Sequence, residues 1–282
     1  MKIFLEIKLA GGLGNQLFQY ATARMICVKN KIPFLLFNTD KFINESLGRR
    51  FGLLHLNIKG RVIKNQQVKN IFSRNTKLNR LVTAVNLHEH IEENGFVLQP
   101  VDHKAGFLTS ISGYWQSANY FNDIRPLLLK EITPLQIPAY PGWISEQTTV
   151  AIHVRRTDYL EEPRYGFLGP DYYARAINFM KSQLTNPLFV VFSDDMEWCR
   201  QEFKEEGYLF VEETAWQADY LQLHLMSKCA HQIIANSSFS WWGAWLNSRK
   251  DKIVLRPSAP FREKTLLYEA HYPEEWIAIN NN

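Results

Sequence analysis

Four residues able to bind or move charge stand close together in the sequence: His153, Arg155, Arg156 and Asp158. The apolar residues within 150–154 alternate with them, which predicts a buried strand with His153 and Arg155 on its other face. In open α/β sheets the ligand crevice lies at the carboxyl ends of the strands, and a guanidinium there can grip phosphate oxygens with two N–H groups at once. The pattern therefore favours an anion site over a surface ion-pair cluster. Asp158 would either orient an arginine or act on a substrate hydroxyl.

A glycine-rich turn precedes the first predicted helix, with Gly12, Gly14 and Asn15 at its centre. Glycines let the backbone turn tightly and approach a ligand, and the helix N-terminus offers unpaired N–H groups to an anion. Leu17 stands where a dinucleotide-binding fingerprint has its third glycine, and no Gly-Lys-Ser/Thr follows, so neither an NAD site nor a P-loop is predicted. The amides of Asn15 and Gln16 suit sugar hydroxyls or phosphate, unless the segment is an ordinary tight turn.

A Ser-Asp-Asp turn, Ser193 to Asp195, follows a short apolar run. One of its acids is expected to cap the next helix, and the other, for which we take Asp194, to bind ribose hydroxyls or a purine edge. The two acids lack the spacing of an Asp-x-Asp metal motif, and no other cluster has metal-ligand spacing, so no metal is predicted.

A second anion cradle is predicted where small polar residues end a strand and a helix begins, at Asn236, Ser237, Ser238 and Phe239. At least two of the three tryptophans that follow are expected to serve packing, because aromatic side chains usually anchor cores; they are Trp241, Trp242 and Trp245. The two cradles, the arginine pair and the Ser-Asp-Asp turn together predict a site for a charged nucleotide or nucleotide sugar.

Short apolar runs alternate with helix-like segments along the chain, which is typical of parallel α/β sheets. Strands are expected at 3–9, 34–37, 150–154, 188–192, 208–211, 232–235 and 253–255, and helices at 15–29, 171–184, 195–206, 217–228 and 239–248. The prolines between 134 and 141 mark the best linker candidate. We therefore expect an α/β protein of two Rossmann-like, doubly wound domains, residues 1–139 and 140–282, facing across a cleft.

Composition sets broad limits. The 282 residues are 46% apolar and 21% charged, and the net charge of +4 is too small to indicate nucleic acid as a partner. Three cysteines without paired spacing fit a reducing compartment, and no apolar run reaches the roughly 20 residues of a membrane span, so a cytoplasmic protein is expected. Seven basic residues and no acid lie within 59–80, which forms either a solvated face or a surface for anionic lipid or a phosphate-bearing substrate.

Several of these motifs, in this order, resemble the α-1,2-fucosyltransferases of glycosyltransferase family eleven: Gly11 to Ala21, His153 to Tyr159, Phe192 to Asp195 and Asn236 to Trp245. Ser112 to Ser117 and the pair Tyr120-Phe121 are also similar to that family. The resemblance runs from the first strand to about residue 255 of the chain, and its several ordered motifs make it specific.

The resemblance implies a GT-B transferase that needs neither metal nor cofactor. It implies transfer of L-fucose, with inversion, from GDP-β-L-fucose to the 2-hydroxyl of a terminal β-galactoside. The acceptor side would be the domain at 1–139, and the GDP-fucose-binding side the domain at 140–282.

Roles for single residues follow from the same resemblance. Arg155 would hold the β-phosphate and stabilise the leaving GDP, with His153 near guanine. Asn15 and the backbone of Gly12 to Gly14 would face the fucose and the diphosphate. The diphosphate and nucleoside pocket would be lined by Ser237, Ser238 and Phe239.

Two roles stay open. Relatives place an acid shortly before the Leu-Met-Ser run at 225–227, where this chain has Gln222, so the guanine reader is Asp219, Gln222 or Asp194. Inversion also needs a group that accepts the acceptor's proton. Asp158 is our first choice, although an aspartate beside an arginine is as often an ion-pair partner.

Other functions are considered beside this one: a transferase of the same architecture with another donor or acceptor, a non-catalytic nucleotide-sugar-binding protein, and an NAD-dependent oxidoreductase, which Leu17 disfavours. The basic run at 59–80 and the resemblance together suggest a lipid-linked acceptor of H-antigen or O-antigen type. Contact with the inner membrane would then be peripheral and would run through 59–80.

Overall fold

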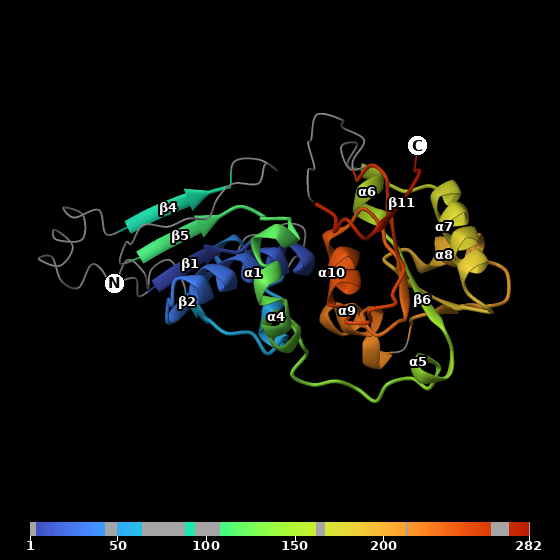
Figure 1. Ribbon diagram of the computed structural model, residues 1–282, viewed down its shortest axis with the longest axis horizontal. Helices are drawn as coiled ribbons and strands as arrows, with labels where there is room; N and C mark the ends of the chain where they lie inside the picture. Colours follow the sequence, from blue (N-terminus) through green and yellow to red (C-terminus); the bar gives the residue numbers. More distant parts are fainter. Residues whose placement is uncertain are drawn as a thin grey trace, which may run out of the picture. The chain divides into compact units, whose positions relative to one another are not determined.

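The computed structural model describes residues 4–42, 50–63, 88–93, 108–161, 167–212, 214–260 and 271–281. The chain divides into two compact units: unit 1 is Met1–Thr133 with Glu269–His271, and unit 2 is Pro134–Tyr268 with Tyr272–Asn282. The contact-based division thus falls after Thr133, and the boundary at 139/140 stays a prediction. Each unit is an α/β structure built on one parallel sheet, as the sequence predicts (Figure 1).

The described strands of unit 1 lie side by side in the order β3-β2-β1-β5-β4 and are all parallel. They are β1 (Phe4–Lys8), β2 (Phe34–Asn38), β3 (Arg61–Ile63), β4 (His88–Glu92) and β5 (Leu108–Ser112). The helices are α1 (Leu13–Lys29) and α4 (Arg125–Glu131), with 3-10 turns at Asp40–Phe42, Leu53–His55, Ala118–Tyr120 and Asn122–Ile124. Since the strand order reverses direction between β1 and β5, their carboxyl ends flank a topological switch point, where open α/β sheets bind ligands.

Helices α1 and α4 are joined by a buried polar contact. The hydroxyl of Tyr20 donates to Glu131 Oε2 at 2.6 Å, and Arg24 Nε and Nη2 approach the same carboxylate at 3.0–3.1 Å. Because Glu131 is only 3% exposed, removal of either partner would leave a poorly compensated buried charge. This contact fixes the body of α1, whose first turn carries three residues predicted to face a ligand.

The described strands of unit 2 lie in the order β11-β10-β9-β6-β7-β8, again all parallel. They are β6 (Thr149–Val154), β7 (Leu188–Ser193), β8 (Tyr208–Phe210), β9 (His231–Ile233), β10 (Val254–Pro257) and β11 (Ile277–Ile279). The helices are α5 (Trp143–Glu146), α6 (Thr157–Glu161), α7 (Pro170–Gln183), α8 (Met196–Glu202), α9 (Asp219–Met226) and α10 (Ser238–Leu246), with a 3-10 turn at Thr214–Trp216. The switch point of this sheet lies between β6 and β9.

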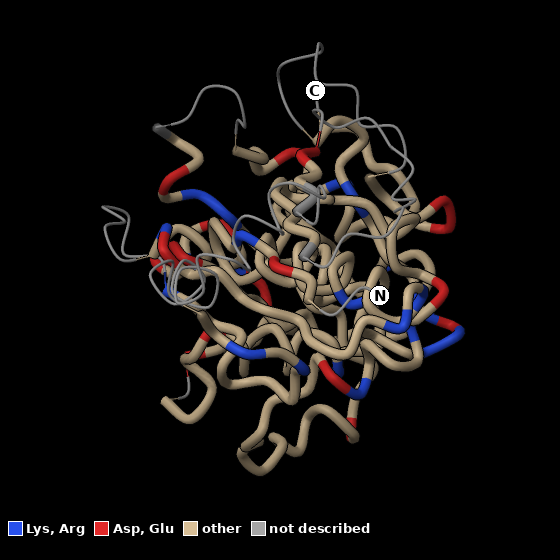
Figure 2. The backbone as a smooth tube through the Cα atoms, turned by 90° about the vertical axis from the view of Figure 1, so that its left-hand side faces the viewer, with Lys and Arg blue, Asp and Glu red and all other residues tan. Residues whose placement is uncertain are grey.

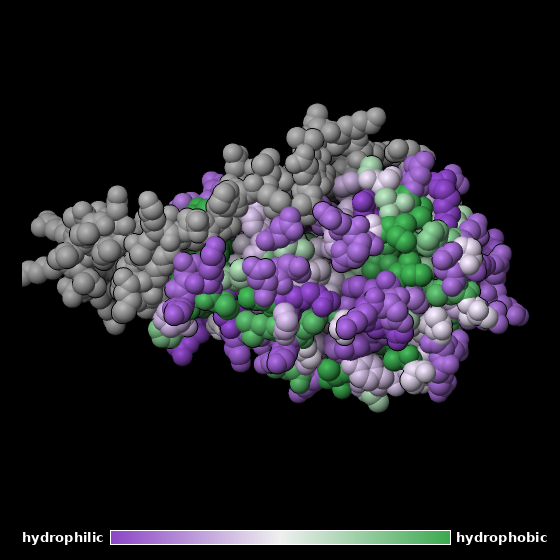
Figure 3. All heavy atoms as spheres, viewed as in Figure 1, coloured by the Kyte–Doolittle hydropathy of each residue, from purple (hydrophilic) through white to green (hydrophobic). Residues whose placement is uncertain are grey.

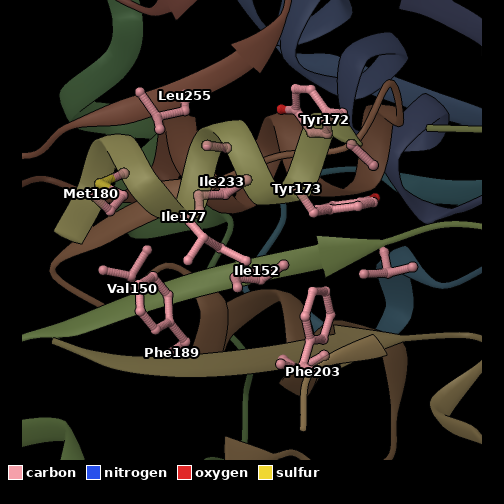
Figure 4. Packing of buried hydrophobic residues seen from close by; sticks show 14 of the residues in the cluster. Val150, Ile152, Tyr172, Tyr173, Ile177, Met180, Phe189, Phe203, Ile233 and Leu255 are labelled. Carbon is pink, nitrogen blue, oxygen red and sulfur yellow. The ribbon is translucent and has the colours of Figure 1, made fainter. Parts of the chain in front are cut away.

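Strand β6 is buried along its whole length because both of its faces are covered. Val150 and Ile152 point toward the apolar side of α7, where Ile177 and Tyr173 meet them (Figure 4). Ala151 belongs to a separate cluster on the opposite face, which is completed by residues of α9. Figure 1 accordingly shows α7 and α8 on one side of β6 and α9 and α10 on the other. A rigid central strand therefore ends in the His153–Asp158 motif.

Residues of opposite charge and of different hydropathy are mixed in the described parts that Figure 2 and Figure 3 show. Figure 2 shows described basic and acidic residues interspersed along the chain, and Figure 3 shows hydrophobic and hydrophilic residues mixed on one face. No described helix is long and apolar enough to cross a membrane. Of the basic run at 59–80, residues 64–80 lie outside the described residues.

The strands and helices predicted from sequence are all present, with ends shifted by a few residues. One correction bears on the glycine-rich turn: α1 begins at Leu13, so Gly14 lies inside the helix and is buried. Only Gly11 of this turn adopts a positive φ, +78°, and a side chain there would meet Asn15 Nδ2 at 2.6 Å. Seven of the described strands and α-helices were not predicted from the sequence: β3, β4, β5, β11, α4, α5 and α6.

Candidate functional site

Apart from Asp219, the predicted charged residues of unit 2 lie at the carboxyl ends of β6 and β7, and the polar residues at 236–238 follow the neighbouring strand β9, at the switch point of the sheet. Two contacts join the end of β6 to the start of α10. The hydroxyl of Tyr159 donates to the backbone oxygen of Asn236 at 3.1 Å, and the rings of His153 and Phe239 lie 5.4 Å apart between centroids. The motifs at 153–158 and 236–239 therefore form one cluster, in the place where this type of sheet binds ligands.

Arg155 is the centre of the cluster. Its Nη2 donates to Asp158 Oδ2 at 2.8 Å, its Nη1 lies 3.3 Å from Asp194 Oδ2, and its guanidinium lies 5.8 Å from the centre of the Tyr159 ring. Burial alone would lower the pKa of Arg155, but the bond to Asp158 and the two nearby carboxylates outweigh burial and raise it. The guanidinium is thus always charged, and it stays one-third exposed.

Asp194 fastens the end of β7 to the turn between β6 and α6. Its Oδ1 accepts from the Arg156 backbone N–H at 2.9 Å, and its Oδ2 accepts from both the backbone N–H and the hydroxyl of Thr157. Burial alone would raise the pKa of Asp194, but these bonds and the charge of Arg155 hold it below its usual value. Asp194 was predicted to bind ribose hydroxyls or a purine edge, but both of its carboxylate oxygens already accept hydrogen bonds from the protein.

Asp195 is the capping acid of the Ser-Asp-Asp turn. Its Oδ1 accepts from the Trp198 N–H at 3.1 Å at the start of α8, and its Oδ2 pairs with Arg156 Nε at 3.1 Å. The Arg156 guanidinium lies 4.4 Å from the centre of the Trp198 ring and 5.0 Å from that of Phe167. Ser193 Oγ accepts from the Asp195 N–H at 2.9 Å. Arg156 and Ser193 thus stabilise the turn. The Arg156 side chain is 15% exposed, less than the side chains of the Arg155–Asp158 pair.

His153 is 5% exposed, and burial together with the charge of Arg155 lowers its pKa to about 3, against the opposing effect of Asp194. The imidazole is therefore neutral at pH 7. Its Nδ1 is buried and has no hydrogen-bond partner among the described residues. A neutral ring with one unused nitrogen suits recognition of a polar edge better than proton transfer near neutral pH.

The second cradle is partly used by the protein itself. Ser237 caps α10, with its Oγ accepting from the Phe239 N–H at 3.3 Å, and Asn236 Nδ2 donates to the backbone oxygen of Pro260 at 3.0 Å. Ser238 opens α10 and is partly exposed. All three tryptophans of α10 are buried, as expected for packing: Trp241, Trp242 and Trp245.

Asp219 stands apart from this cluster. It is the first residue of α9 and exposed, and it makes none of the described hydrogen bonds or ion pairs that join the residues around Arg155. Gln222, one turn further along α9, is half-buried.

The remaining predicted residues lie in unit 1. Gly12 caps α1 without a side chain of its own, and a Cβ built on it meets no atom within 4 Å, so its surroundings are open. Asn15 Oδ1 accepts from Gln116 Nε2 at 2.8 Å. Gln16 is fully buried and bonds to the backbone of Gly11, Arg50 and Gly52, so its amide has a structural task.

Three residues of the cluster in unit 2 were not predicted to have a role: Thr157, Tyr159 and Trp198. Thr157 and Tyr159 lie within the motif from His153 to Tyr159, so the charged residues beside them already indicated a site at this position. Trp198 stands three residues after the capping Asp195, in the first turn of the helix that Asp195 opens. In this cluster two guanidinium groups face three carboxylates, those of Asp158, Asp194 and Asp195.

The chain is similar to known glycosyltransferases along nearly its whole length. Residues 1–280 match the profile of Glycosyl transferase family 11. An alpha-1,2-colitosyltransferase of Escherichia coli is 30% identical over 292 residues, covering 96% of this chain and 97% of the relative. The O-antigen biosynthesis glycosyltransferase WbnK of Escherichia coli is 32% identical over 286 residues, with 88% and 92% covered. Galactoside 2-alpha-L-fucosyltransferase Sec1 of Mus musculus is 26% identical over 302 residues, with 97% and 73% covered.

Solved structures share the fold. NodZ alpha-1,6-fucosyltransferase soaked with GDP-fucose superposes with a TM-score of 0.52 at 13% identity, covering 87% of this chain and 93% of the other. An Arabidopsis thaliana FUT1 mutant in complex with GDP gives a TM-score of 0.53 at 11% identity, covering 98% and 76%. The predicted GT-B class, α/β with two parallel-sheet units, is thereby confirmed. With a match across nearly its whole length, the chain belongs to glycosyl transferase family 11.

Proposed function

We propose that this glycosyltransferase is an inverting galactoside α-1,2-fucosyltransferase. It moves L-fucose from GDP-β-L-fucose to the 2-hydroxyl of a terminal β-galactoside, on an H-antigen-like or O-antigen glycan. The observation that carries the proposal is the Arg155 guanidinium at the carboxyl end of β6. It lies between Asp158, which makes no other described hydrogen bond, and Asp194, which makes several. The activities of the relatives, galactoside fucosyl transfer and α-1,2-colitosyl transfer, support the linkage and the sugar class.

The diphosphate of the donor takes the place of Asp158 on Arg155. The Arg155–Asp158 pair is about one-third exposed on each side and rests on a single hydrogen bond, so a diphosphate carrying more charge can replace Asp158 on Arg155. Asp194 is held by three further bonds and stays in place. Arg155 then meets the negative charge that develops on GDP as the bond between C1 of fucose and the phosphate oxygen breaks.

The displaced Asp158 carboxylate becomes the proton acceptor. Its only described hydrogen bond is the one to Arg155, and its Oδ1 is buried without a partner. In the reaction the galactoside O2 bonds to C1 of fucose from the face opposite to GDP. The O2 proton passes to Asp158, and GDP leaves with the electron pair of the broken bond. Asp158 thus alternates between orienting Arg155 and acting as the base.

The nucleoside lies against His153 and Phe239, beside the Ser238 end of α10. The unused Nδ1 of His153 supports a contact with the guanine edge. Because both oxygens of Asp194 are engaged, Asp219 or Gln222 is the better supported guanine reader. From unit 1, Asn15 and the backbone of Gly12 to Gly14 contact the fucose and the diphosphate.

The reaction proceeds without a metal ion or other cofactor, since Arg155 supplies the positive charge. We place the acceptor on a lipid carrier, with peripheral membrane contact through 59–80. Flotation with vesicles containing anionic lipid at low salt tests that contact, and a chain that stays at the bottom of the gradient would rule it out.

A second donor is GDP-colitose, because an Escherichia coli relative 30% identical over 96% of this chain is a colitosyltransferase. Colitose is fucose without its 3-hydroxyl. A site built to bond that hydroxyl rejects the deoxy sugar, whereas a site that does not bond it accepts both donors. Rates with the two donors at equal concentration separate these activities.

The test of the proposal is the structure of the product. Incubation with GDP-fucose and lactose should give a trisaccharide in which NMR shows α-fucose on O2 of galactose. A product with fucose on another hydroxyl would contradict the linkage, and a product only with GDP-colitose would contradict the donor.

A further inference from the structure

The turn that follows β5, residues Gly113–Gln116, lies at the switch point of unit 1. Because β5 pairs with β1, this β5 turn and the start of α1 share one edge of the sheet. Two hydrogen bonds connect them: Gln116 Nε2 donates to Asn15 Oδ1, and Gln19 Nε2 donates to the backbone oxygen of Gly113, both at 2.8 Å. The β5 turn is therefore adjacent to the residues proposed to face the donor sugar.

The β5 turn has an unusual backbone that a single carboxylate holds. Gly113 and Trp115 have φ values of +125° and +58°, and a positive φ is strained for a bulky residue such as tryptophan. Glu93, directly after β4, accepts from two consecutive N–H groups of the turn: Tyr114 N to Oε2 at 2.6 Å and Trp115 N to Oε1 at 2.9 Å. Each carboxylate oxygen thus takes one N–H, an arrangement that fits this bend.

A third element holds the same turn. His271, from the short C-terminal segment that belongs to unit 1, donates from Nδ1 to the backbone oxygen of Gln116 at 2.8 Å. Strained backbone of this kind persists only where the surroundings hold it, and it clusters at functional sites. With Glu93, Gln19, Asn15 and His271 all engaged, the conformation of the β5 turn is firmly set.

What this bracing presents to solvent is an aromatic side chain. Within the turn Trp115 is buried, Gly113 and Gln116 are half-buried, and Tyr114 alone is exposed, at 39%. An exposed aromatic ring on a rigid support offers an apolar face beside a polar hydroxyl. A β-galactoside is a suitable ligand, because its axial 4-hydroxyl leaves the C–H groups of C3, C4 and C5 on one apolar face. Stacking of that face leaves the 2-hydroxyl at the edge of the sugar, where it can react.

We propose that Tyr114 is the stacking surface for the galactose ring of the acceptor, and that Glu93 is the positioning residue that holds Tyr114 in place. The inference rests on the proposed function for the identity of the acceptor. It adds a residue that determines acceptor specificity and one that acts through it, both in unit 1.

The experiment compares four variants in GDP release at saturating GDP-fucose, with N-acetyllactosamine varied, and in GDP release without acceptor. Tyr114→Ala should raise the acceptor KM about tenfold, the loss of one aromatic contact, and leave acceptor-free release unchanged. Tyr114→Phe keeps the ring and should keep the acceptor KM. Glu93→Gln can offer only one oxygen to the two N–H groups and should raise the acceptor KM about fivefold. Glu92→Gln, the same change at the exposed neighbouring acid, should match wild type.

The outcomes separate this inference from the proposed function. A wild-type enzyme that N-acetyllactosamine stimulates, together with an unchanged acceptor KM in Tyr114→Ala, overturns the stacking role alone. The donor KM of Glu93→Gln is measured with GDP-fucose varied at saturating N-acetyllactosamine. If it rises by the same factor as the acceptor KM, Glu93 supports the fold and does not position Tyr114. A wild-type enzyme that no galactoside stimulates overturns this inference and the galactoside acceptor together.

Discussion

The Arg155 guanidinium lies between two carboxylates, with Nη2 2.8 Å from Asp158 Oδ2 and Nη1 3.3 Å from Asp194 Oδ2. The two acids differ in how they are held. Asp194 also accepts from two backbone N–H groups and a hydroxyl, whereas Asp158 has no other described bond. A phosphate that approaches Arg155 therefore meets one fixed carboxylate and one that can leave.

Arg155 should not be replaceable by lysine. Arg155→Lys keeps the charge but cannot reach two oxygens in a fixed plane, so GDP-fucose transfer should fall about 10²-fold to 10³-fold, the usual effect of removing a group that stabilises developing charge. The measurement is kcat for GDP release. Arg249→Ala is the matched control, because Arg249 forms an exposed pair with Asp251 away from the cluster, and it should keep wild-type activity. A lysine variant with near-normal kcat would show that Arg155 does not contact the phosphate.

Asp158→Asn should separate catalysis from folding. The substitution removes a proton acceptor and breaks one partly exposed ion pair but keeps the shape of the side chain, so the melting temperature should stay within about 2 °C of wild type. Transfer to the galactoside should fall about 10²-fold to 10⁴-fold, as expected for loss of a general base. Single-turnover transfer and a thermal melt of the same sample provide both values. If most activity remains with an unchanged pH dependence, another group takes the proton.

Asp194→Asn, unlike Asp158→Asn, should lower the stability of the folded protein. The variant loses charge-assisted bonds to the Arg156 and Thr157 turn, and the free energy of unfolding should fall by about 1.5–3 kcal/mol at neutral pH. Because the folded state lowers the pKa of Asp194, this stabilisation is present above the unfolded pKa of about 3.9 and is lost as the pH falls through the folded value. Urea unfolding of wild type and variant at pH 7 and near pH 3 tests this. The difference in the free energy of unfolding between wild type and variant should be smaller near pH 3 than at pH 7. A difference that is the same at both pH values would show that the charge of Asp194 is not responsible.

His153 should make the protein less stable in weak acid. Its pKa is about 3 in the folded state and near 6.5 in the unfolded chain, so only the unfolded chain takes up this proton between those values. The resulting stability is complete above pH 6.5 and declines as the pH falls toward 3. His224 and His231 have lowered pKa values and contribute in the same direction.

Unfolding free energies from pH 7 to pH 4 test the role of His153. His153→Gln should reduce the slope by up to about 1.4 kcal/mol per pH unit, the value for one proton. His55→Gln, at an exposed position, should leave the slope as in wild type. An unchanged slope in the His153 variant would show that His153 titrates normally.

The central strands β6 and β7 of unit 2 were predictable because each contains a nearly continuous apolar run, whereas β11 of the same sheet was missed. Phe189 to Phe192, for example, is buried on both faces and can hardly be anything but a central strand. β4 and β5 read His-Glu-His-Ile-Glu and Leu-Thr-Ser-Ile-Ser, with no strong local preference. They become strands through pairing with each other and of β5 with β1, which no local pattern reveals.

Contacts between distant segments were also unpredictable in the candidate site. The cluster of Arg155, Arg156 and Asp158 follows from their positions in the chain, but the acid that each arginine holds does not. The register of β6 and β7 places Val154 opposite Ser193, so that Asp194 reaches Arg155 and Asp195 reaches Arg156. Glu93 was missed for a similar reason, since it meets the β5 turn only because β4 pairs with β5.

Fucosyl transfer to a galactoside without a metal ion is tested most directly by GDP release from GDP-fucose in EDTA, with and without N-acetyllactosamine. We expect slow release with the donor alone and a strong stimulation by the galactoside, unaffected by EDTA. Release that the galactoside does not stimulate, or that EDTA abolishes and magnesium restores, would contradict metal-independent fucosyl transfer to a galactoside.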